Sequence, residues 1–204
     1  MKTKCSSRMK ALLLVLAMVL SLFCVSIGTA HPRFTDVPDS FWASKEIAWA
    51  VDKGVVNGTS ATTFSPNDKT LRGQMTAILY RYAGEPAVSG ASSFSDVKAS
   101  IYYANAASWA QKNNILISTV SGSNKFLGDT PISRAEFCAM VYNYAGYKSI
   151  DRKTTSAAPF SDVKGLSSEL RAAINWAYAN GIVNGVDKTH FSPDSTLTRA
   201  QAVV

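Results

Sequence analysis

Cysteine is scarce in this sequence, and its positions limit the disulfides that can form. Cys5 and Cys24 lie within residues 1–30, and Cys138 is the one cysteine after that segment. In the chain that starts at residue 31, Cys138 is therefore alone and no internal disulfide is possible. The remaining chain of about 174 residues is long enough to bury a core without one. Its stability must therefore come from packing.

Histidines and the common catalytic motifs are also scarce. His31 and His190 are the two histidines, and neither has an evident partner in the sequence. There is no H-E-x-x-H, G-x-S-x-G or phosphate-binding loop. Cys138 falls within a predicted helix, where a small packed residue is expected rather than a nucleophile. We therefore expect no enzyme activity, no metal site and no cofactor.

Long apolar runs are absent apart from one near the start. Four basic residues precede an apolar run from Ala11 to about Val25, and small residues follow at Gly28 and Ala30. This pattern predicts a secretory signal peptide over residues 1–30. The run of about fifteen residues is shorter than the roughly 20 that a membrane-spanning helix needs. We expect a secreted protein.

A strong excess of one charge is missing from the rest of the chain. After residue 30 there are seventeen basic and fourteen acidic residues, a net charge of +3. Basic clusters with interleaved aromatic residues, which are typical of nucleic-acid binding, do not occur. We therefore expect no nucleic-acid partner.

What the sequence does contain is a unit repeated three times. Each copy opens with Phe, then Thr or Ser, then Asp and Val, and its Asp is followed thirteen or fourteen residues later by a Trp. In every copy a second Phe precedes an Arg by eight residues. Chance does not keep this register three times, so the fold is predicted to consist of three similar units. The residues concerned are Asp36, Asp96 and Asp162; Trp49, Trp109 and Trp176; Phe64, Phe126 and Phe191; and Arg72, Arg134 and Arg199.

Each copy predicts two helices joined by a loop. Around the third Trp, apolar residues at 170, 173, 174 and 177 follow the i, i+3, i+4, i+7 spacing of a helix. Gly54 and Gly181 are expected to end the first helix, and Gly84 and Gly146 the second. The three tryptophans lie beside the apolar stripe and are expected in the core. We predict an all-α fold.

The second helix is expected to start at the Arg. The segments S-R-A-E at 133–136 and T-R-A-Q at 198–201 fit the capping box, whereas the first copy has Leu71 there, so Thr70 is its expected cap. A cation in the first turn opposes the helix dipole by about 0.3–1 kcal/mol, which suggests that an anion compensates. Helix N-termini and the planar guanidinium both suit carboxylate or phosphate.

Acidic residues near these arginines allow another interpretation. Each Arg could pair with an acid four or five residues earlier in its own loop, although such an exposed pair contributes only about 0–1 kcal/mol. The loop acids are Asp68, Asp129 and Asp194. The Asp of the opening motif is expected to be a turn or cap residue ahead of the first helix, because the dense ligand spacing of a calcium loop is missing.

Taken together, these motifs resemble the S-layer homology family. The shared elements are the F-x-D-V opening, the mid-helix Trp, G-V-V-N-G at 54–58 and G-I-V-N-G at 181–185, F-S-P-N or F-S-P-D, and the S/T-R-A-E/Q helix start. The resemblance covers essentially residues 31–204. It implies a pseudo-threefold arrangement around a central helical bundle, with ligand grooves between neighbouring repeats. The implied repeats are residues 31–86, 92–147 and 158–204.

The resemblance also implies a ligand. In the family, the helix-start Arg contacts the acidic groups of a secondary cell-wall polysaccharide, commonly the carboxylate of pyruvylated sugars. The residues that take this role here are Arg72, Arg134 and Arg199.

Other residues are expected near the grooves. Trp42 and Tyr102 occupy matching positions and could stack on sugars, while Glu169 stands there in the third copy. Gly58 and Gly185 are expected to supply a positive φ or a close backbone approach to a groove. The second copy has Ser118 instead and lacks the G-x-V-N-G motif, which weakens the case for a ligand there.

The implied function is non-covalent anchoring at the cell surface, through a secondary polysaccharide or another peptidoglycan-associated glycan. One alternative is an S-layer protein that self-associates into sheets, and another is the targeting part of a wall-active enzyme. The third copy ends five residues after Arg199, before any residue that matches Ile78, Leu79 or Tyr82. We therefore expect exposed apolar surface, in a fragment of a longer protein or in one that receives a helix from another molecule; the fragment is favoured.

Overall fold

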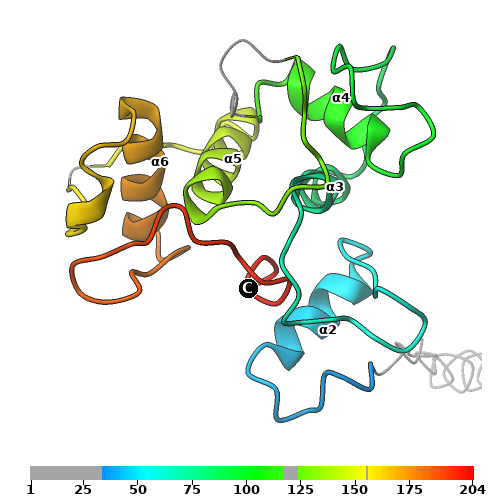
Figure 1. Ribbon diagram of the computed structural model, residues 1–204, viewed down its shortest axis with the longest axis horizontal. Coiled ribbons are helices and arrows are strands. Elements are labelled where there is room, and N and C mark those ends of the chain that lie inside the picture. The colour runs from blue at the N-terminus through cyan, green and yellow to red at the C-terminus, as the bar shows by residue number, and fades with distance from the viewer. Residues whose placement is uncertain (1–33, 117–123, 155) are drawn as a thin grey trace, which may run out of the picture. The chain divides into compact units, whose positions relative to one another are not determined.

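The computed structural model describes residues 34–116, 124–154 and 156–204. The predicted signal peptide and Ser118 lie outside these residues. Helices make up the regular structure: α2 (Ser44–Asp52), α3 (Arg72–Tyr82), α4 (Ala104–Lys112), α5 (Arg134–Tyr147), the short 3-10 helix η1 (Ser161–Val163) and α6 (Ser168–Ala179) (Figure 1). Pairing between extended segments is limited, within those ranges, to isolated bridges. The predicted all-α class is confirmed.

None of the helices in the described part of the chain has the length and apolar character to cross a membrane. The predicted stripe around the third Trp forms the buried face of α6, where Ala173, Ile174 and Ala177 are at most 1% exposed. Ser167 caps this helix, because its hydroxyl accepts the Leu170 N–H at 3.3 Å.

The second helices start where the sequence predicts, at Arg72 and Arg134. The capping box of α5 is present, with the Glu136 N–H donating to the Ser133 hydroxyl and the Ser133 N–H donating to the Glu136 carboxylate. The expected cap at Thr70 is wrong, since its buried hydroxyl has no hydrogen-bond partner. Instead the Leu71 N–H donates to Gln74 Oε1 at 3.0 Å.

In the third repeat, the box at 198–201 forms the same two hydrogen bonds, between Thr198 and Gln201. Residues 199–203 nevertheless form a turn rather than a helix. The predicted helix start at Arg199 is therefore only partly realised.

Positive φ angles end most of the helices, as predicted for three of the four glycines. Gly54, Gly84 and Gly181 have φ of 66°, 88° and 68° and follow α2, α3 and α6. The prediction for Gly146 is wrong, because α5 runs through it to Tyr147. Ser149, with φ of 57°, takes the left-handed position after that helix.

Backbone hydrogen bonds join the three repeats in a closed ring. The Thr70 N–H donates to the Leu197 carbonyl at 2.8 Å, the Leu197 N–H to the Ile132 carbonyl at 3.4 Å, and the Ile132 N–H to the Thr70 carbonyl at 2.9 Å. Each residue lies two positions before the second-helix Arg of its repeat. The third repeat is thus bonded directly to the first as well as to the second. The pseudo-threefold arrangement about a helical bundle stays a prediction.

Two of the three tryptophans pack as predicted. Trp109 and Trp176 are 3% and 4% exposed, and each contacts a Tyr on the second helix of the preceding repeat. The ring centroids of Trp109 and Tyr80 lie 5.5 Å apart, and those of Trp176 and Tyr142 lie 5.7 Å apart. Aromatic pairs of this geometry add to the stabilisation from burial.

The prediction that Trp49 belongs to the core is wrong, since 49% of it is exposed. Tyr80 and Tyr142 each follow their helix-start Arg by eight residues. The matching place, eight residues after Arg199, lies beyond Val204. Trp49 contacts Tyr82 instead, and Tyr82 is itself 56% exposed. The expectation that an incomplete third repeat causes such exposure stays a prediction.

Candidate functional site

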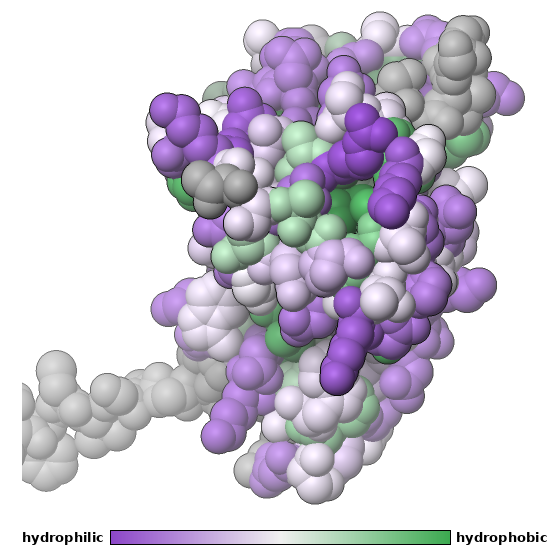
Figure 2. Space-filling model, turned by 90° about the vertical axis from the view of Figure 1, so that its left-hand side faces the viewer, coloured by the Kyte–Doolittle hydropathy of each residue, from purple (hydrophilic) through white to green (hydrophobic). Residues whose placement is uncertain are grey.

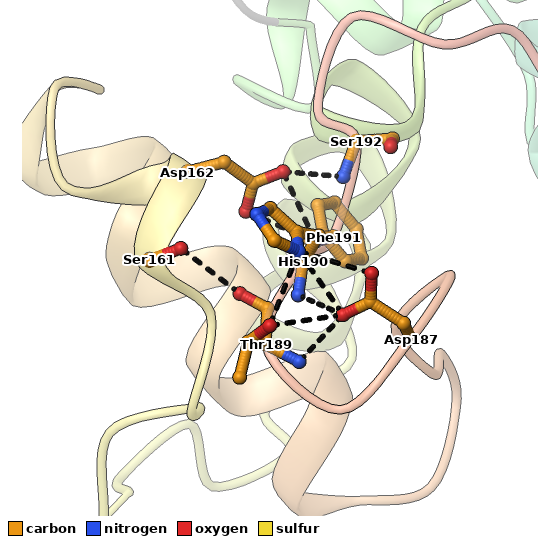
Figure 3. Close-up of polar contacts among 7 residues, drawn as sticks. All are labelled: Ser161, Asp162, Asp187, Thr189, His190, Phe191 and Ser192. Atoms are coloured by element: carbon orange, nitrogen blue, oxygen red, sulfur yellow. Dashed lines mark hydrogen bonds and ion pairs between the residues drawn. The ribbon is translucent and has the colours of Figure 1, made fainter.

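An acidic side chain fastens the second-Phe loop in every repeat. Asp162 accepts hydrogen bonds from the N–H groups of Phe191 and Ser192 (Figure 3). Asp36 does the same for Phe64 and Ser65, and Asp96 for Phe126 and Leu127. We call each of these pairs of hydrogen bonds a loop clasp. Within each clasp the second donor residue has a positive φ; these residues are Ser65, Leu127 and Ser192.

The sequence prediction for these acids is confirmed for its turn alternative and wrong for its cap alternative. All three lie in turns or in η1, as expected, but the positions that cap the first helices belong to other residues. Burial would raise the pKa of each carboxyl, and the backbone N–H donors outweigh it, so the pKa lies below the ordinary value of 3.8 for Asp36, Asp96 and Asp162.

Two of the clasped loops orient an arginine from the preceding repeat in the ring. Arg199 Nε donates to the Phe64 carbonyl at 2.9 Å, and its Nη2 donates to the Asn57 carbonyl at 2.9 Å. Arg134 makes the matching bonds, from Nε to Phe191 at 2.9 Å and from Nη2 to Asn184 at 2.6 Å. The two contacts fix the plane of each guanidinium group.

Each of these guanidinium groups also stacks on the Phe ring of the loop it contacts. The Cζ of Arg134 lies 4.4 Å from the centroid of Phe191, and that of Arg199 lies 4.6 Å from Phe64. Cation–π contact favours a desolvated cation. Burial lowers the pKa of both arginines, so a bound anion would offset part of the cost of burying these charges.

Arg72 differs from the other two arginines. Its guanidinium is bound by the Glu136 carboxylate at 2.8 Å, and the side chains of the pair are only 9% and 18% exposed. Arg72 Nε is buried without a hydrogen-bond partner. The internal ion pair already supplies the negative charge, so Arg72 is not included in the site proposed below.

The alternative pairing of each arginine with an acid in its own loop is absent from the described residues. No ion pair joins Arg72, Arg134 or Arg199 to Asp68, Asp129 or Asp194 there.

One cavity gathers predicted residues from all three repeats, and we call it the first groove. It has a volume of about 330 Å³ and is lined by Val56, Asn57, Gly58, Thr59, Gln74, Ala77, Ile78, Arg81, Tyr102 and Arg199. Two cations and no acid are among these residues. Nη1 of Arg199 has no hydrogen-bond partner among the described residues, which leaves it able to donate to a ligand.

Other predicted residues are placed as follows. Tyr102 is 62% exposed on the lining of the first groove, and Trp42, at 60% exposed, lies outside it. Arg134 and Asn184 meet beside Gly185, away from the first groove.

The two glycines serve close packing. A Cβ on Gly58 would lie 2.5 Å from the Phe34 ring, and one on Gly185 would lie 2.5 Å from the Phe160 ring. Neither glycine is among those with a positive φ. The close approach is thus to the opening Phe and to carbonyl oxygens of the glycine's own loop, and of the two glycines Gly58 also lines the first groove.

Several site residues were missed by the sequence prediction. Asn57 and Asn184 belong to the recognised N-G motif, but it is their backbone carbonyls that accept hydrogen bonds from the arginines. Every residue has such a carbonyl, so the residue type does not predict this role. Gln74 and Arg81 line the first groove because of contacts between repeats. The ion pair of Glu136 also joins two repeats, so spacing along the chain does not predict it.

Cys138 and His190, the residues considered for catalysis, make contacts of a structural kind. Cys138 is 0% exposed, and burial raises the pKa of its thiol to about 12, as expected for a packed residue. His190, which has no evident partner in the sequence, pairs with Asp187 at 3.0 Å in an exposed loop (Figure 3).

Comparison with known proteins gives the same three segments. A family model described as the S-layer homology domain matches residues 33–76, 93–138 and 159–203. An amylopullulanase of Thermoanaerobacterium thermosulfurigenes is 32% identical over 83% of this chain and 9% of that enzyme. An endoglucanase of Bacillus sp. (strain KSM-635) is 28% identical over 99% of this chain and 22% of the enzyme. An S-layer protein of Bacillus licheniformis is 25% identical over 86% of this chain and 20% of that protein. The chain thus spans less than a quarter of each relative.

Proposed function

Because the chain belongs to the S-layer homology family, we propose that it attaches to the bacterial cell wall by binding an acidic, pyruvylated polysaccharide in the first groove. The family and its surface-protein relatives indicate a secreted protein associated with the cell surface or wall. Domains of this family are anchoring modules without catalytic activity. The acidic sugar and the residues that bind it are our proposal.

The charge of the first groove carries this proposal. Arg81 and Arg199 are both on its lining, and none of the described residues that line it is acidic. Arg81 has a distant partner in Glu85, at 3.9 Å, whereas Arg199 faces carbonyl oxygens and an aromatic ring. Carbonyl groups do not neutralise a guanidinium, so an incoming carboxylate gains a charge-assisted hydrogen bond.

The shape of the first groove suits one sugar unit with an acidic substituent. Its volume of about 330 Å³ lies at the lower end of the range for small-ligand sites. The exposed ring of Tyr102 offers a face for a sugar, and Asn57 and Gln74 offer polar groups at the same cavity. Affinity for a long polymer grows when further units of it bind elsewhere on the protein.

Arg199 is the residue to test first. In the Arg199→Ala variant we expect a roughly 10- to 150-fold loss of affinity for purified wall polymer, since a hydrogen bond to a charged group contributes about 1.5–3 kcal/mol. Co-sedimentation with sacculi and calorimetry with the polymer measure this loss. Arg199→Lys should recover only part of it, because lysine lacks the planar fork.

Arg171→Ala is the matched control, because it removes one exposed positive charge outside the first groove. Circular dichroism should show unchanged helix content in all three variants. Unchanged polymer binding by a folded Arg199→Ala variant contradicts the assignment.

The enzyme relatives favour a related role as the attachment part of a carbohydrate-active protein. The region matching this chain is 9% of the amylopullulanase and 22% of the endoglucanase. On this proposal the purified chain binds wall polymer and releases no reducing ends from it. Measured hydrolysis by the purified chain contradicts a purely anchoring role.

A further inference from the structure

A second cavity lies between α5 and α6, at the place that matches the first groove one repeat later. Its volume is about 580 Å³. Leu116, Ala139, Asn143 and Glu169 line it where Val56, Ala77, Arg81 and Tyr102 line the first groove. We call it the second groove. Figure 2, which views the molecule from the α6 side, shows apolar surface surrounded by hydrophilic residues on this face.

The two grooves have opposite charge. The lining of the first holds Arg81 and Arg199 and no acid. Among the described residues, the lining of the second holds Glu169 and no Lys or Arg. A carboxylate ligand that is attracted to the first groove is therefore repelled from the second.

The missing cation of the second groove is Arg72, which matches Arg199. Arg72 is 7% exposed and does not line the cavity. Glu136 holds it at 2.8 Å, while the corresponding residue near Arg199 is the neutral Gln74. Both Glu136 and Gln74 are the third residue of their helix, and both bind the backbone N–H of the capping position. The capping contact is thus the same in both repeats, and the charge is the difference.

We propose that the second groove binds an uncharged sugar unit, and that an acidic one is excluded by Glu169 on the lining and by Glu136, which holds Arg72 away from the cavity. The lining supplies groups suited to sugar hydroxyls: Tyr142, Asn143, Ser167, Ser168 and Glu169. A carboxylate such as Glu169 accepts hydrogen bonds from hydroxyl groups. Apolar side chains of Ala139 and Ala173 offer surface for the apolar face of the ring. This inference rests on the proposed function, because the uncharged sugar it assigns to the second groove is a unit of the same wall polysaccharide.

The test uses two small probes, a methyl hexoside carrying a 4,6-pyruvate ketal and the same hexoside without the ketal. Two-dimensional NMR of the full chain locates each probe. We expect the acidic probe to shift resonances of Gln74 and Tyr102, and the neutral probe to shift those of Tyr142 and Asn143. Shifts at Tyr142 and Asn143 with the acidic probe, or none there with the neutral probe, overturn the inference.

Exchanging the third helix residue tests the role of Glu136. Gln74→Glu should hold Arg199 as Glu136 holds Arg72, and weaken the acidic probe at the first groove at least tenfold. Glu136→Gln should create a new acidic-probe site at the second groove, seen as shifts at Asn143. Glutamate suits the capping box, so the Gln74→Glu variant should fold even where Glu136→Gln does not.

The two proposals fail in different ways. If the wild-type chain binds the acidic probe nowhere, the proposed function is wrong, and the neutral probe still decides what the second groove takes. If the first groove binds the acidic probe and Gln74→Glu leaves that affinity unchanged, the role assigned to Glu136 is wrong.

Discussion

At the residue scale, the loop clasp links stability to the site. Asp36 holds the backbone N–H groups of Phe64 and Ser65, and the Phe64 carbonyl then accepts Arg199 Nε. Asp162, Phe191 and Arg134 repeat the sequence of contacts. A carboxylate with no ligand contact of its own therefore positions each of these guanidinium groups.

The loop clasps predict a loss of stability in acid. Each clasp Asp has a pKa below 3.8 in the folded protein. A carboxyl whose pKa is lowered on folding stabilises the protein above its unfolded pKa, and this contribution is lost as the pH falls through the folded value. Urea unfolding should therefore show a free energy of unfolding that is constant near pH 6 and falls below about pH 4.

Replacing one clasp residue tests the cause. Asp162→Asn should lower the free energy of unfolding at pH 6 by about 1.5–3 kcal/mol and make the acid loss smaller. The control is Asp194→Asn, an exposed carboxylate outside the loop clasp. Equal effects of the two substitutions would contradict the assignment.

At the element scale, one tryptophan is exposed where the other two are buried. Trp109 and Trp176 are covered by Tyr80 and Tyr142 on second helices. Trp49 is left beside Lys45, Glu46, Val203 and Val204 in a shallow cavity. A tryptophan of a first helix is therefore buried where a Tyr on the second helix of the preceding repeat covers it.

This rule predicts the effect of adding residues after Val204 that let the third repeat form its second helix. A variant extended by eight helix-forming residues, with Tyr eight residues after Arg199, should bury Trp49. We expect about 1.5–3 kcal/mol of added stability for covering a large apolar side chain. A blue shift of Trp fluorescence and a higher urea midpoint would report it. In the Trp49→Ala background the extension should gain much less, and an equal gain there contradicts the rule.

The elements themselves could largely be predicted from the sequence. The periodicity at 170–177 and the capping motifs at 133–136 locate α6 and the start of α5. The prediction that Gly146 ends α5 is wrong because the helix is about one turn longer than a C-terminal glycine cap would indicate. The length of the helix depends on packing at its end. The burial of a tryptophan depends on the preceding repeat in the ring, so the pattern within one repeat cannot distinguish Trp49 from Trp109. The clasp acids recur at 36, 96 and 162, but their contact with a loop about thirty residues later is tertiary.

At the scale of the whole molecule, the ring of hydrogen bonds makes the repeats interdependent. Thr70, Ile132 and Leu197 each donate to one partner and accept from another. Removing any repeat leaves two backbone groups of the ring unpaired, which is costly for buried groups.

The ring predicts cooperative unfolding. Fluorescence and far-UV circular dichroism of residues 34–204 should report one urea transition with the same midpoint. A chain ending at residue 158 should have a free energy of unfolding far below two-thirds of that of residues 34–204, because it lacks the hydrogen-bond partners of Thr70 and Ile132. Two separate transitions in the full chain, or a stable two-repeat chain, would contradict this.

The first groove takes Asn57 from the first repeat, Tyr102 from the second and Arg199 from the third. A gene duplication that copied a single repeat would therefore carry no complete first groove with it. On the proposed function, the heritable unit of wall recognition is the triplet, and new specificities should arise by exchanging whole triplets or by point changes within one.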